Sequence, residues 1–538
     1  MWTTVEPSAE LREQYRAQGW WDDRTLPTLL HQALTRSGGT TFRVHSRTRP
    51  WRGTIGDVTT LGRRLATGLA DRGITAGDPV AFTLPNSAEA AAVFYGLALL
   101  GATLVPVGHT AGPRDLDHAL RESGARALVV WNQPDRPFAF DALSRADLGH
   151  VVAIGDAAAP ADVIDFDELR AAAPLDEPAT VDPAQPAVIG WTSGTTGAPK
   201  GVLLSHRALC TETRAHMSPM MEARSRPLAS TSPIAHVTGM LVSVLVPPLL
   251  GQQIHLLDYW DADEVLELMT TESLSAGTGA PLFLASLLDH PACTPTHHEL
   301  IEMSSLGGAT VPAELVLTAE RYGITAIRGY GCTEHPSISL GMRDDPADKR
   351  AHTDGRLCAG VDVRIVDDNE RNLPTGNHGE ILSRGPDLFC GYTDPVLNAA
   401  AFDKDGWYRT GDIGWLDEDG YLSVIDRKKD IVIRAGMNIS PAEIEAAMTF
   451  MPQVAGVAVI AVPDARTGER ACAFVRPAPG GPTPTIEQVQ HHLSAVGLAK
   501  YKWPEELRYQ YDDFPRTPAG KVRKTELRAA WAAYQKDG

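Results

Sequence analysis

A short segment rich in glycine, hydroxyl side chains and lysine carries the strongest chemical signal in the sequence. It follows the apolar stretch 187–190 and reads Thr192, Ser193, Gly194, Thr195, Thr196, Gly197, Ala198, Pro199, Lys200. Glycine lets backbone amides approach phosphate oxygens, the hydroxyl groups add further donors, and lysine supplies a positive charge. The segment therefore predicts a loop that binds a polyphosphate.

The spacing within this segment differs from that of a Walker A loop. The pattern G-x-x-x-x-G-K-[ST] is missing, and Lys200 is followed by Gly201 and the apolar residues 202–204, which predict another strand. A flexible Gly/Ser/Thr surface loop is the alternative interpretation. The density and order of the donors favour a nucleotide enzyme of another kind over that alternative.

Further segments follow in a fixed order along the chain. They are residues 232–239, 305–310, 330–334, 408–412, 426–430 and 515–521. Together with residues 191–201, they resemble the signature motifs of the acyl-adenylate-forming superfamily, which includes acyl-CoA synthetases, aryl-acid ligases, luciferases and adenylation domains of peptide synthetases. The resemblance covers nearly the whole chain.

The resemblance implies a site for ATP and magnesium. Tyr330 would stack on adenine, Thr333 would contact the α-phosphate, and Glu334 would hold Mg²⁺, a hard cation that prefers oxygen ligands. Asp412 and Arg427 would bind the ribose hydroxyls. The other nucleotide-binding residues that it implies are Thr192, Ser193, Gly194, Thr195, Thr196, Gly197, Lys200, Gly308, Ala309, Thr310, Gly329 and Gly331.

The resemblance also implies two half-reactions. Lys521 would bridge the carboxylate and phosphate oxygens while an acyl-adenylate forms and pyrophosphate leaves, with Thr192, Glu334 and His236 as further catalytic residues. The C-terminal part would then rotate about Lys429, and Gly436 would line the tunnel through which the thiol of coenzyme A attacks. The predicted activity is that of an ATP- and magnesium-dependent carboxylate–CoA ligase, with ATP, Mg²⁺ and coenzyme A bound.

Two other functions stay open at this point. A ligase of the same chemistry would deliver the acyl group to the phosphopantetheine of a separate carrier protein, or stop at the adenylate. A catalytically inactive, nucleotide-binding regulatory protein is the alternative from another class. The acid is expected to have an uncharged acyl body, because the positions expected around its pocket are mostly small or apolar. They are His236, Thr238, Gly239, Met240, Gly279, Ala280, Gly308, Gly329, Gly331 and His335.

The elements that position these residues are predicted from periodicity. Leu61, Leu65 and Leu69 recur at helical spacing, followed by a strand at 79–84, a helix at 88–100 and a strand at 102–107. This alternation predicts an α/β fold with mostly parallel sheets. Residues 360–426 predict a small antiparallel sheet or barrel. We expect an N-terminal domain at 1–426 and a small, mobile α+β domain at 427–538.

In that second domain, Ser440, Pro441 and Glu443 form a helix start with a capping box. Strands are predicted at 454–462, 471–475 and 506–511, and a helix at 485–496. The apolar stretch 240–250 predicts a buried core element, since it is too short to cross a bilayer. Residues 417–420 predict a hairpin turn rather than a calcium loop.

Composition limits the class of protein. A formal net charge of −18 argues against a protein that coats nucleic acid. The six cysteines are scattered without a C-x-x-C pair, and Cys293 with its neighbouring histidines is a weak zinc signal. The first residues lack the pattern of a signal peptide. We therefore expect a cytoplasmic enzyme that binds neither nucleic acid nor membrane, with a homodimer as a base-rate expectation.

Overall fold

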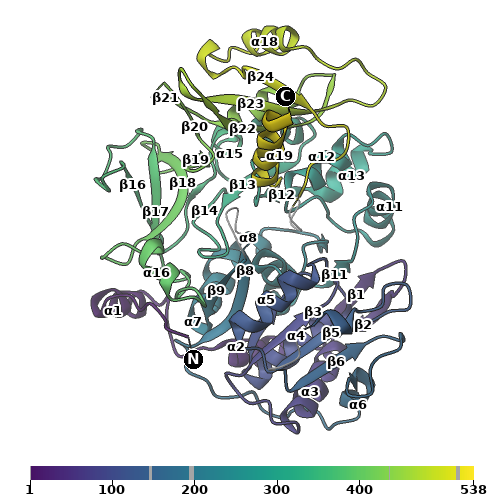
Figure 1. The fold of residues 1–538 in the computed structure, drawn as a ribbon. Coiled ribbons are helices and arrows are strands. Elements are labelled where there is room, and N and C mark those ends of the chain that lie inside the picture. The colour runs from purple at the N-terminus through teal and green to yellow at the C-terminus, as the bar shows by residue number, and fades with distance from the viewer. Residues whose placement is uncertain (1, 144–147, 193–198, 436, 517–521, 538) are drawn as a thin grey trace. The chain divides into compact units, whose positions relative to one another are not determined.

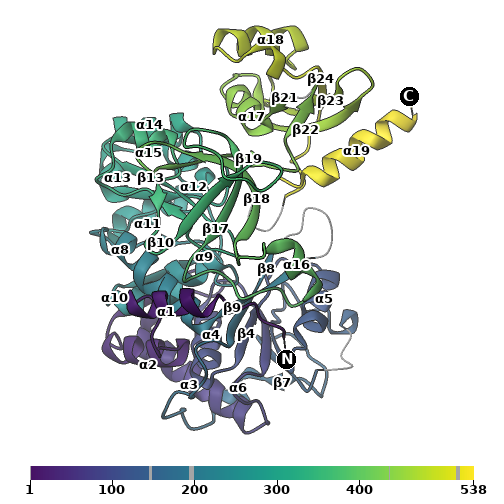
Figure 2. The same ribbon diagram turned by 90° about the vertical axis from the view of Figure 1, so that its left-hand side faces the viewer.

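The structure, a computed structural model, describes residues 2–143, 148–192, 199–435, 437–516 and 522–537. These residues form two compact units, which are treated separately below (Figures 1 and 2). The first unit holds the described residues up to Asp362 together with Ser383–Tyr408, and the second holds Val363–Leu382 and those from Arg409 onward. The predicted boundary at residue 427, like the predicted rotation about Lys429, stays a prediction.

A seven-stranded sheet is the centre of the first unit. In spatial order its strands are β7 (Ile164–Asp165), β6 (His150–Ile154), β5 (Ala127–Trp131), β3 (Pro79–Thr83), β4 (Thr103–Pro106), β8 (Pro186–Thr192) and β9 (Lys200–Ser205). The neighbouring strands are parallel except for β8 and β9, which are antiparallel. The strand predicted after Lys200 is therefore present, and it is the strand that departs from the parallel pattern.

Two further four-stranded sheets belong to the first unit. One has the order β10 (Ala229–Ser230), β11 (Ile254–Leu257), β1 (Thr41–His45), β2 (Trp51–Thr54), and the other β12 (Met303–Leu306), β13 (Thr325–Tyr330), β14 (Ser339–Leu340), β15 (Arg356–Leu357). The helices are α1 (Ala9–Ala17), α2 (Leu26–Arg36), α3 (Ile55–Ala70), α4 (Ala88–Leu100), α5 (Pro113–Ser123), η1 (Phe140–Ala142), α6 (Phe166–Arg170), α7 (His206–Thr211), η2 (Glu212–Met217), α8 (Ser218–Glu222), α9 (Val237–Met240), η3 (Leu241–Leu245), α10 (Val246–Leu250), α11 (Ala262–Glu272), α12 (Pro281–Leu288), α13 (Pro295–Ile301), α14 (Ala313–Arg321), α15 (Ala347–His352) and α16 (Val396–Ala401). Segments η2 and η3 have π-helical hydrogen bonding.

Alternate side chains of the central strands face two different cores, which explains the apolar sequence of these strands. Val80 and Phe82 of β3 pack in the core that contains α2, α3 and α4, whereas Ala81 packs in the core that contains α5. Ala127 and Leu128 of β5 divide in the same way. A strand that is buried on both faces reads as a continuous apolar run, as these strands do.

Helices α3 and α4 approach each other closely because glycine stands at their contact. A Cβ at Gly62 would lie 2.5 Å from the carbonyl oxygen of Ala92, and a Cβ at Gly96 would lie 2.3 Å from that of Gly62. No side chain fits at such distances, so this contact requires glycine. The result is a helix α4 that is almost completely buried beside the sheet.

The second unit is an α+β assembly. One sheet has the order β16 (Asp362–Val366), β17 (Gly379–Arg384), β18 (Tyr408–Leu416), β19 (Leu422–Arg427). A few residues at the ends of these strands, Asp362, Ser383, Arg384 and Tyr408, are assigned to the first unit. The other has the order β21 (Met437–Ile439), β20 (Val432–Arg434), β23 (Gly468–Pro477), β22 (Val454–Asp464), with β24 (Glu506–Tyr509) beside β23. The helices are α17 (Pro441–Thr449), α18 (Ile486–Ala495), η4 (Lys500–Lys502) and α19 (Lys524–Asp537).

The mixed α/β fold predicted from the sequence is confirmed. Helix α4 has the predicted bounds, residues 240–250 form buried helical turns, and the Asp417 amide donates to Tyr421 across the predicted hairpin turn. Ser440 accepts the amide of Glu443 at the start of α17, but the Glu443 carboxylate pairs with Lys502 at 2.6 Å. The predicted capping box is therefore wrong in its second half, because a tertiary ion pair takes the carboxylate.

Within the parts of the chain that the structure describes, no helix combines the length and the apolar character needed to cross a bilayer.

Candidate active site

The ends of the predicted phosphate loop lie side by side at the edge of the central sheet. Thr192 ends β8 and Lys200 begins β9, and the two residues are directly paired in the antiparallel register. The residues between them that were predicted to bind phosphate, Ser193 to Gly197, lie outside the described residues. The structure therefore fixes where the loop leaves the sheet and where it returns.

Glu334, the predicted magnesium ligand, lies close to this hairpin in the first unit. Its side-chain Oε1 accepts a hydrogen bond of 2.8 Å from the Tyr392 hydroxyl, and its carbonyl oxygen accepts the Phe389 amide. The Lys200 ammonium lies over the Tyr392 ring, 5.2 Å from its centroid. Burial and the Glu334 carboxylate raise the pKa of Tyr392, so the hydroxyl remains a donor. One tyrosine thus connects the loop lysine with the acidic residue.

The motif 330–334 packs directly on β8. A Cβ at Gly190 would lie 2.7 Å from the Cγ2 of Thr333, so the absence of a side chain on the strand lets the motif approach. Within the motif, a Cβ at Gly331 would lie 1.9 Å from the carbonyl oxygen of Pro336, and the Cys332 amide donates to the carbonyl of His335. This tight loop therefore needs glycine at position 331.

The predicted adenine-binding segments follow two neighbouring parallel strands. Strands β12 and β13 pair in parallel, with Leu306 opposite Arg328. Gly308, Ala309 and Thr310 come just after β12 and are exposed, while Gly329 and Tyr330 end β13. The carboxyl ends of parallel strands are where open α/β sheets bind ligands. Gly308 has φ +74°, which favours glycine at this turn.

The segment 232–239 contains His236, the predicted catalytic histidine. Its residues are held by Asn86, whose side chain donates to the carbonyl of Ser232 at 3.1 Å and accepts the amide of Ile234 at 3.0 Å. His236 precedes helix α9, and its Nε2 is buried without a hydrogen-bond partner among the described residues. Burial lowers the pKa of His236, so the ring is neutral at pH 7. A neutral, unpartnered imidazole nitrogen suits contact with a bound substrate.

One predicted pocket residue proves to lie elsewhere. His335 is fully buried, and its ring bonds to Ser383 at 2.9 Å and to Asp387 at 3.2 Å. The prediction that His335 lines the acid pocket is therefore wrong, because the loop after Glu334 turns this side chain into the core.

Asp412 and Arg427, the predicted ribose ligands, are paired in the second unit. They stand opposite each other on β18 and β19, and Arg427 Nε lies 2.7 Å from Asp412 Oδ1. The Asp412 amide donates to Thr410 Oγ1, which in turn donates to the carbonyl of Ile381. The next residue, Lys428, is bound to Glu380 and Asp368 at 3.0 Å each. Register and ion pairing thus orient Asp412.

Two further predicted residues lie on either side of a described part of the second unit. Lys521 and Gly436 lie outside the described residues, as do the loop residues named above. The residues that flank Gly436 form the strands β20 and β21, which pair antiparallel.

Two supporting residues were not predicted from the sequence. Tyr392 binds Glu334 from 58 positions away, and Asn86 binds Ile234 from 148 positions away. Tyr392 stands in the short run Gly391, Tyr392, Thr393, whose glycine could have marked a close approach to a neighbouring strand. No local pattern marks Asn86.

We expect the Tyr392→Phe variant to need more magnesium. Without the hydroxyl, the Glu334 carboxylate loses a hydrogen bond of about 1.5–3 kcal/mol, which corresponds to about a 10- to 150-fold change in an equilibrium constant. The measurement is the Mg²⁺ dependence of pyrophosphate release. Tyr95→Phe is the matched control, because that hydroxyl is also buried but has no hydrogen-bond partner among the described residues. An equal effect in both variants would contradict the assignment.

Comparisons with known proteins identify the family. The sequence profile of the AMP-binding enzyme family matches residues 33–393, and that of the AMP-binding enzyme C-terminal domain matches residues 443–521. The medium-chain fatty-acid–CoA ligase of Escherichia coli is 30% identical over 98% of this chain and 94% of its own length. The indoleacetate–CoA ligase of Aromatoleum aromaticum is 32% identical over 87% of this chain and 91% of its own length.

A solved structure gives the same result. ATP-bound MatB from Rhodopseudomonas palustris superposes with a TM-score of 0.83 at 27% identity, covering 94% of this chain and 99% of that one. The chain therefore belongs to the AMP-binding enzyme family, the acyl-adenylate-forming superfamily. Within that family it is an AMP-forming acid–thiol ligase.

Proposed function

We propose that this protein is an ATP- and magnesium-dependent carboxylate–CoA ligase for an acid with an uncharged acyl body. The observation that supports this most is the arrangement in the first unit, where Lys200, Tyr392 and Glu334 lie beside the strands that carry the phosphate loop. It brings together a cation for the phosphates and a carboxylate for a metal.

Glu334 fits a magnesium ion. Mg²⁺ takes oxygen ligands and is commonly held by one or two carboxylates and the phosphates of the substrate. Tyr392 fixes Oε1 of Glu334, so the carboxylate keeps one orientation. When bound, the ion would reduce the negative charge of the triphosphate. Thr192 and Thr333 stand near enough in the fold to contribute hydroxyl donors, since Thr192 ends β8 and Thr333 packs on Gly190 of the same strand.

In the first half-reaction a carboxylate oxygen attacks the α-phosphorus of ATP and pyrophosphate leaves. Two anions must be brought together, so positive groups and an in-line geometry lower the barrier. We assign this role to Lys521, with Lys200 at the leaving phosphates. Asp412 and Arg427 hold the ribose. His236, being neutral, allows a negatively charged carboxylate to pass without fixing it in an ion pair.

In the second half-reaction a thiol loses its proton, its sulfur attacks the acyl carbon, and AMP leaves. We propose coenzyme A as the thiol, because both curated relatives named above are CoA ligases that align along most of their length. Gly436 would line the path of the pantetheine. A carrier-protein phosphopantetheine is the second candidate acceptor and would use the same path.

The acid itself is assigned only by class. Ala235 and Val237 flank His236, so no carboxylate stands there to hold a substrate amine. A Cβ at Gly239 would lie 1.8 Å from the carbonyl oxygen of Pro233, so glycine is required for the turn and no side chain extends from that position. Medium-chain, alicyclic and aromatic acids are the candidates to compare.

A two-stage assay tests the proposal. Pyrophosphate exchange into ATP over a panel of acids identifies the acid, and AMP release is then measured without thiol, with coenzyme A and with a phosphopantetheinyl carrier protein. Stimulation by coenzyme A supports the proposal. Stimulation by the carrier protein alone would replace the proposal with the carrier-linked function. No stimulation by either thiol would replace it with the adenylate-only function. Failure of every acid to give exchange would favour a nucleotide-binding protein without catalysis.

We expect Gly436→Leu to separate the two half-reactions. A leucine side chain would obstruct the thiol, so thioester formation should slow by about 10-fold or more, while pyrophosphate exchange stays at the parental rate. Gly481→Leu, in an exposed loop of the same unit, is the control. Parental thioester formation in the Gly436 variant would contradict the predicted tunnel.

A further inference from the structure

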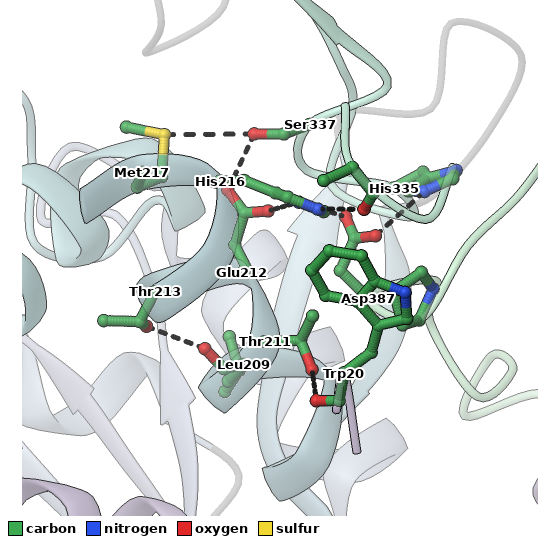
Figure 3. Close-up of polar contacts among 12 residues, drawn as sticks. Trp20, Leu209, Thr211, Glu212, Thr213, His216, Met217, His335, Ser337 and Asp387 are labelled. Atoms are coloured by element: carbon green, nitrogen blue, oxygen red, sulfur yellow. Dashed lines mark hydrogen bonds and ion pairs between the residues drawn. The ribbon is translucent and has the colours of Figure 1, made fainter. Parts of the chain in front are cut away.

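A group of buried charged side chains in the first unit has no role in the reaction described above. Glu212 and His216 come from the π-helical segment η2, and Asp387 comes from the segment after β17 (Figure 3). The side chains of Glu212, His216 and Asp387 are 1%, 0% and 0% exposed. Ionisable groups are rarely so completely buried unless they pair with one another or bind a metal.

Three donor atoms of this group converge. His216 Nδ1 lies 3.0 Å from Glu212 Oε2 and 3.7 Å from Asp387 Oδ2, and one atom from each residue lies within 4.8 Å of the others. Ligand atoms around a tetrahedral cation with bonds of about 2.0 Å are roughly 3.3 Å apart. The two distances from His216 fall on either side of that value. Both spacings from His216 therefore suit ligands of one small cation.

The far nitrogen of His216 is already bound. Nε2 lies 2.8 Å from the carbonyl oxygen of Ala359, which can only accept, so Nε2 carries a proton. In a neutral imidazole the Nδ1 lone pair would then point at the two carboxylates. A metal-ligating histidine typically donates its other N–H to a carbonyl or a carboxylate in this way.

The outer oxygens of both carboxylates are held as well. Ser337 donates to Glu212 Oε1 at 2.7 Å, and His335 Nε2 lies 3.2 Å from Asp387 Oδ1 (Figure 3). By contrast, Asp387 Oδ2 is buried without a hydrogen-bond partner among the described residues. Its distance of 3.7 Å from His216 Nδ1 is too long for a hydrogen bond. Each ligand thus has a fixed outer atom, and the inner oxygen of Asp387 lacks a donor.

The negative charge of the two carboxylates can be balanced by a divalent cation or by protons. On these three residues, two carboxylates and one imidazolium sum to −1, whereas two carboxylates, a neutral imidazole and a divalent cation sum to zero. The buried His335, whose Nε2 is 3.2 Å from Asp387 Oδ1, supplies the balancing charge only if it is protonated. The rival arrangement protonates both Glu212 and His216. Burial raises the pKa of Glu212; burial opposes a charge on His216, but the Asp387 and Glu212 carboxylates raise its pKa to about 11. Protons balance the charge but leave Asp387 Oδ2 without a hydrogen bond.

We propose that Glu212, His216 and Asp387 form a structural site for a divalent transition cation of the zinc type, distinct from the magnesium at Glu334. One nitrogen and two oxygen ligands suit Zn²⁺, which binds imidazole and carboxylate, better than Mg²⁺, which prefers oxygen ligands and keeps several waters. The cation would tie η2 to the segment after β17. That segment also donates the Phe389 amide to the carbonyl of Glu334.

The metal content of the untagged full-length protein tests this site. After expression in zinc-supplemented medium and exhaustive dialysis, we expect about one cation per chain by elemental analysis. Glu212→Gln and Asp387→Asn should each reduce it at least about 10-fold. His290→Gln is the control, because His290 pairs with Asp263 outside this group and should keep the parental content. Less than about 0.1 cation per chain in the parent, also after refolding with Zn²⁺, overturns the proposal.

The Glu212→Gln variant also separates the cation from the proton arrangement. Glutamine is isosteric with a protonated glutamate, so the proton arrangement predicts an unchanged thermal midpoint. Loss of a bound cation predicts a midpoint lower by about 5 °C or more, and chelator should then shift only proteins that contain the metal. An unchanged midpoint, or a cation content that both carboxylate variants retain, overturns the proposal. None of these readouts depends on catalysis.

Discussion

Replacing Lys521 by alanine should reduce the rate of acyl-adenylate formation by about 10²- to 10³-fold, the loss seen when one preorganised charge-stabilising donor is removed. Lysine at this position would neutralise the carboxylate and the phosphate as they approach. The profile of the C-terminal domain ends at this residue, at position 521. Pyrophosphate exchange with the best acid of the panel measures the effect.

The same variant should keep the second half-reaction. Supplied with synthetic acyl-adenylate, it should form the thioester at close to the parental rate, because no phosphate anion is attacked in that step. Lys428→Ala is the matched control, since Lys428 lies in the same unit and is occupied by Glu380 and Asp368. Equal losses in the two half-reactions would refute a role for Lys521 in adenylation alone.

Asp412→Asn should lower kcat/KM for ATP by about 100-fold, because a carboxylate that accepts from two hydroxyls gives hydrogen bonds of about 1.5–3 kcal/mol each. The parent should also prefer ATP to 2′-deoxy-ATP by about 10-fold or more, whereas the variant should discriminate much less. Comparing both nucleotides isolates the contact with the ribose from any general damage.

A structural explanation must be excluded for this variant, since Asp412 is paired with Arg427. Glu506→Gln is the control, because Glu506 is another largely buried partner of arginine in the same unit, 2.7 Å from Arg470. If both variants lose activity to the same extent, and the preference for ATP over the deoxynucleotide survives in Asp412→Asn, then Asp412 stabilises the sheet rather than binding the ribose.

Local sequence signals predicted the first unit well. The bounds of α4 were predicted correctly because Ser87 caps its first turn and the positive φ of Gly101 ends it, both of which are local effects. Helix α19 was not predicted from the sequence. Leu527 of α19 belongs to the same buried cluster as Ile460 and Cys472 of the sheet.

The residues of the candidate site were also predicted only where a local sequence pattern marks them. Motifs carry Lys200, Glu334 and Asp412, whose chemistry is visible in short runs of sequence. Tyr392 and Asp387 were missed because their partners lie 58 and 52 positions away, and only the folded chain brings them together. His335 shows the converse error, since a residue next to a motif was assumed to share its pocket.

The contact between Gly190 and Thr333 bears on the thermodynamics of nucleotide binding. A strand and a loop that meet without an intervening side chain restrict each other's movement, so Thr333, a proposed contact of the α-phosphate, is in place when the first unit folds. Binding of ATP then costs the protein little conformational entropy in each catalytic cycle. Calorimetric titration with ATP should accordingly show a small heat-capacity change, unlike that of a segment that folds as it binds.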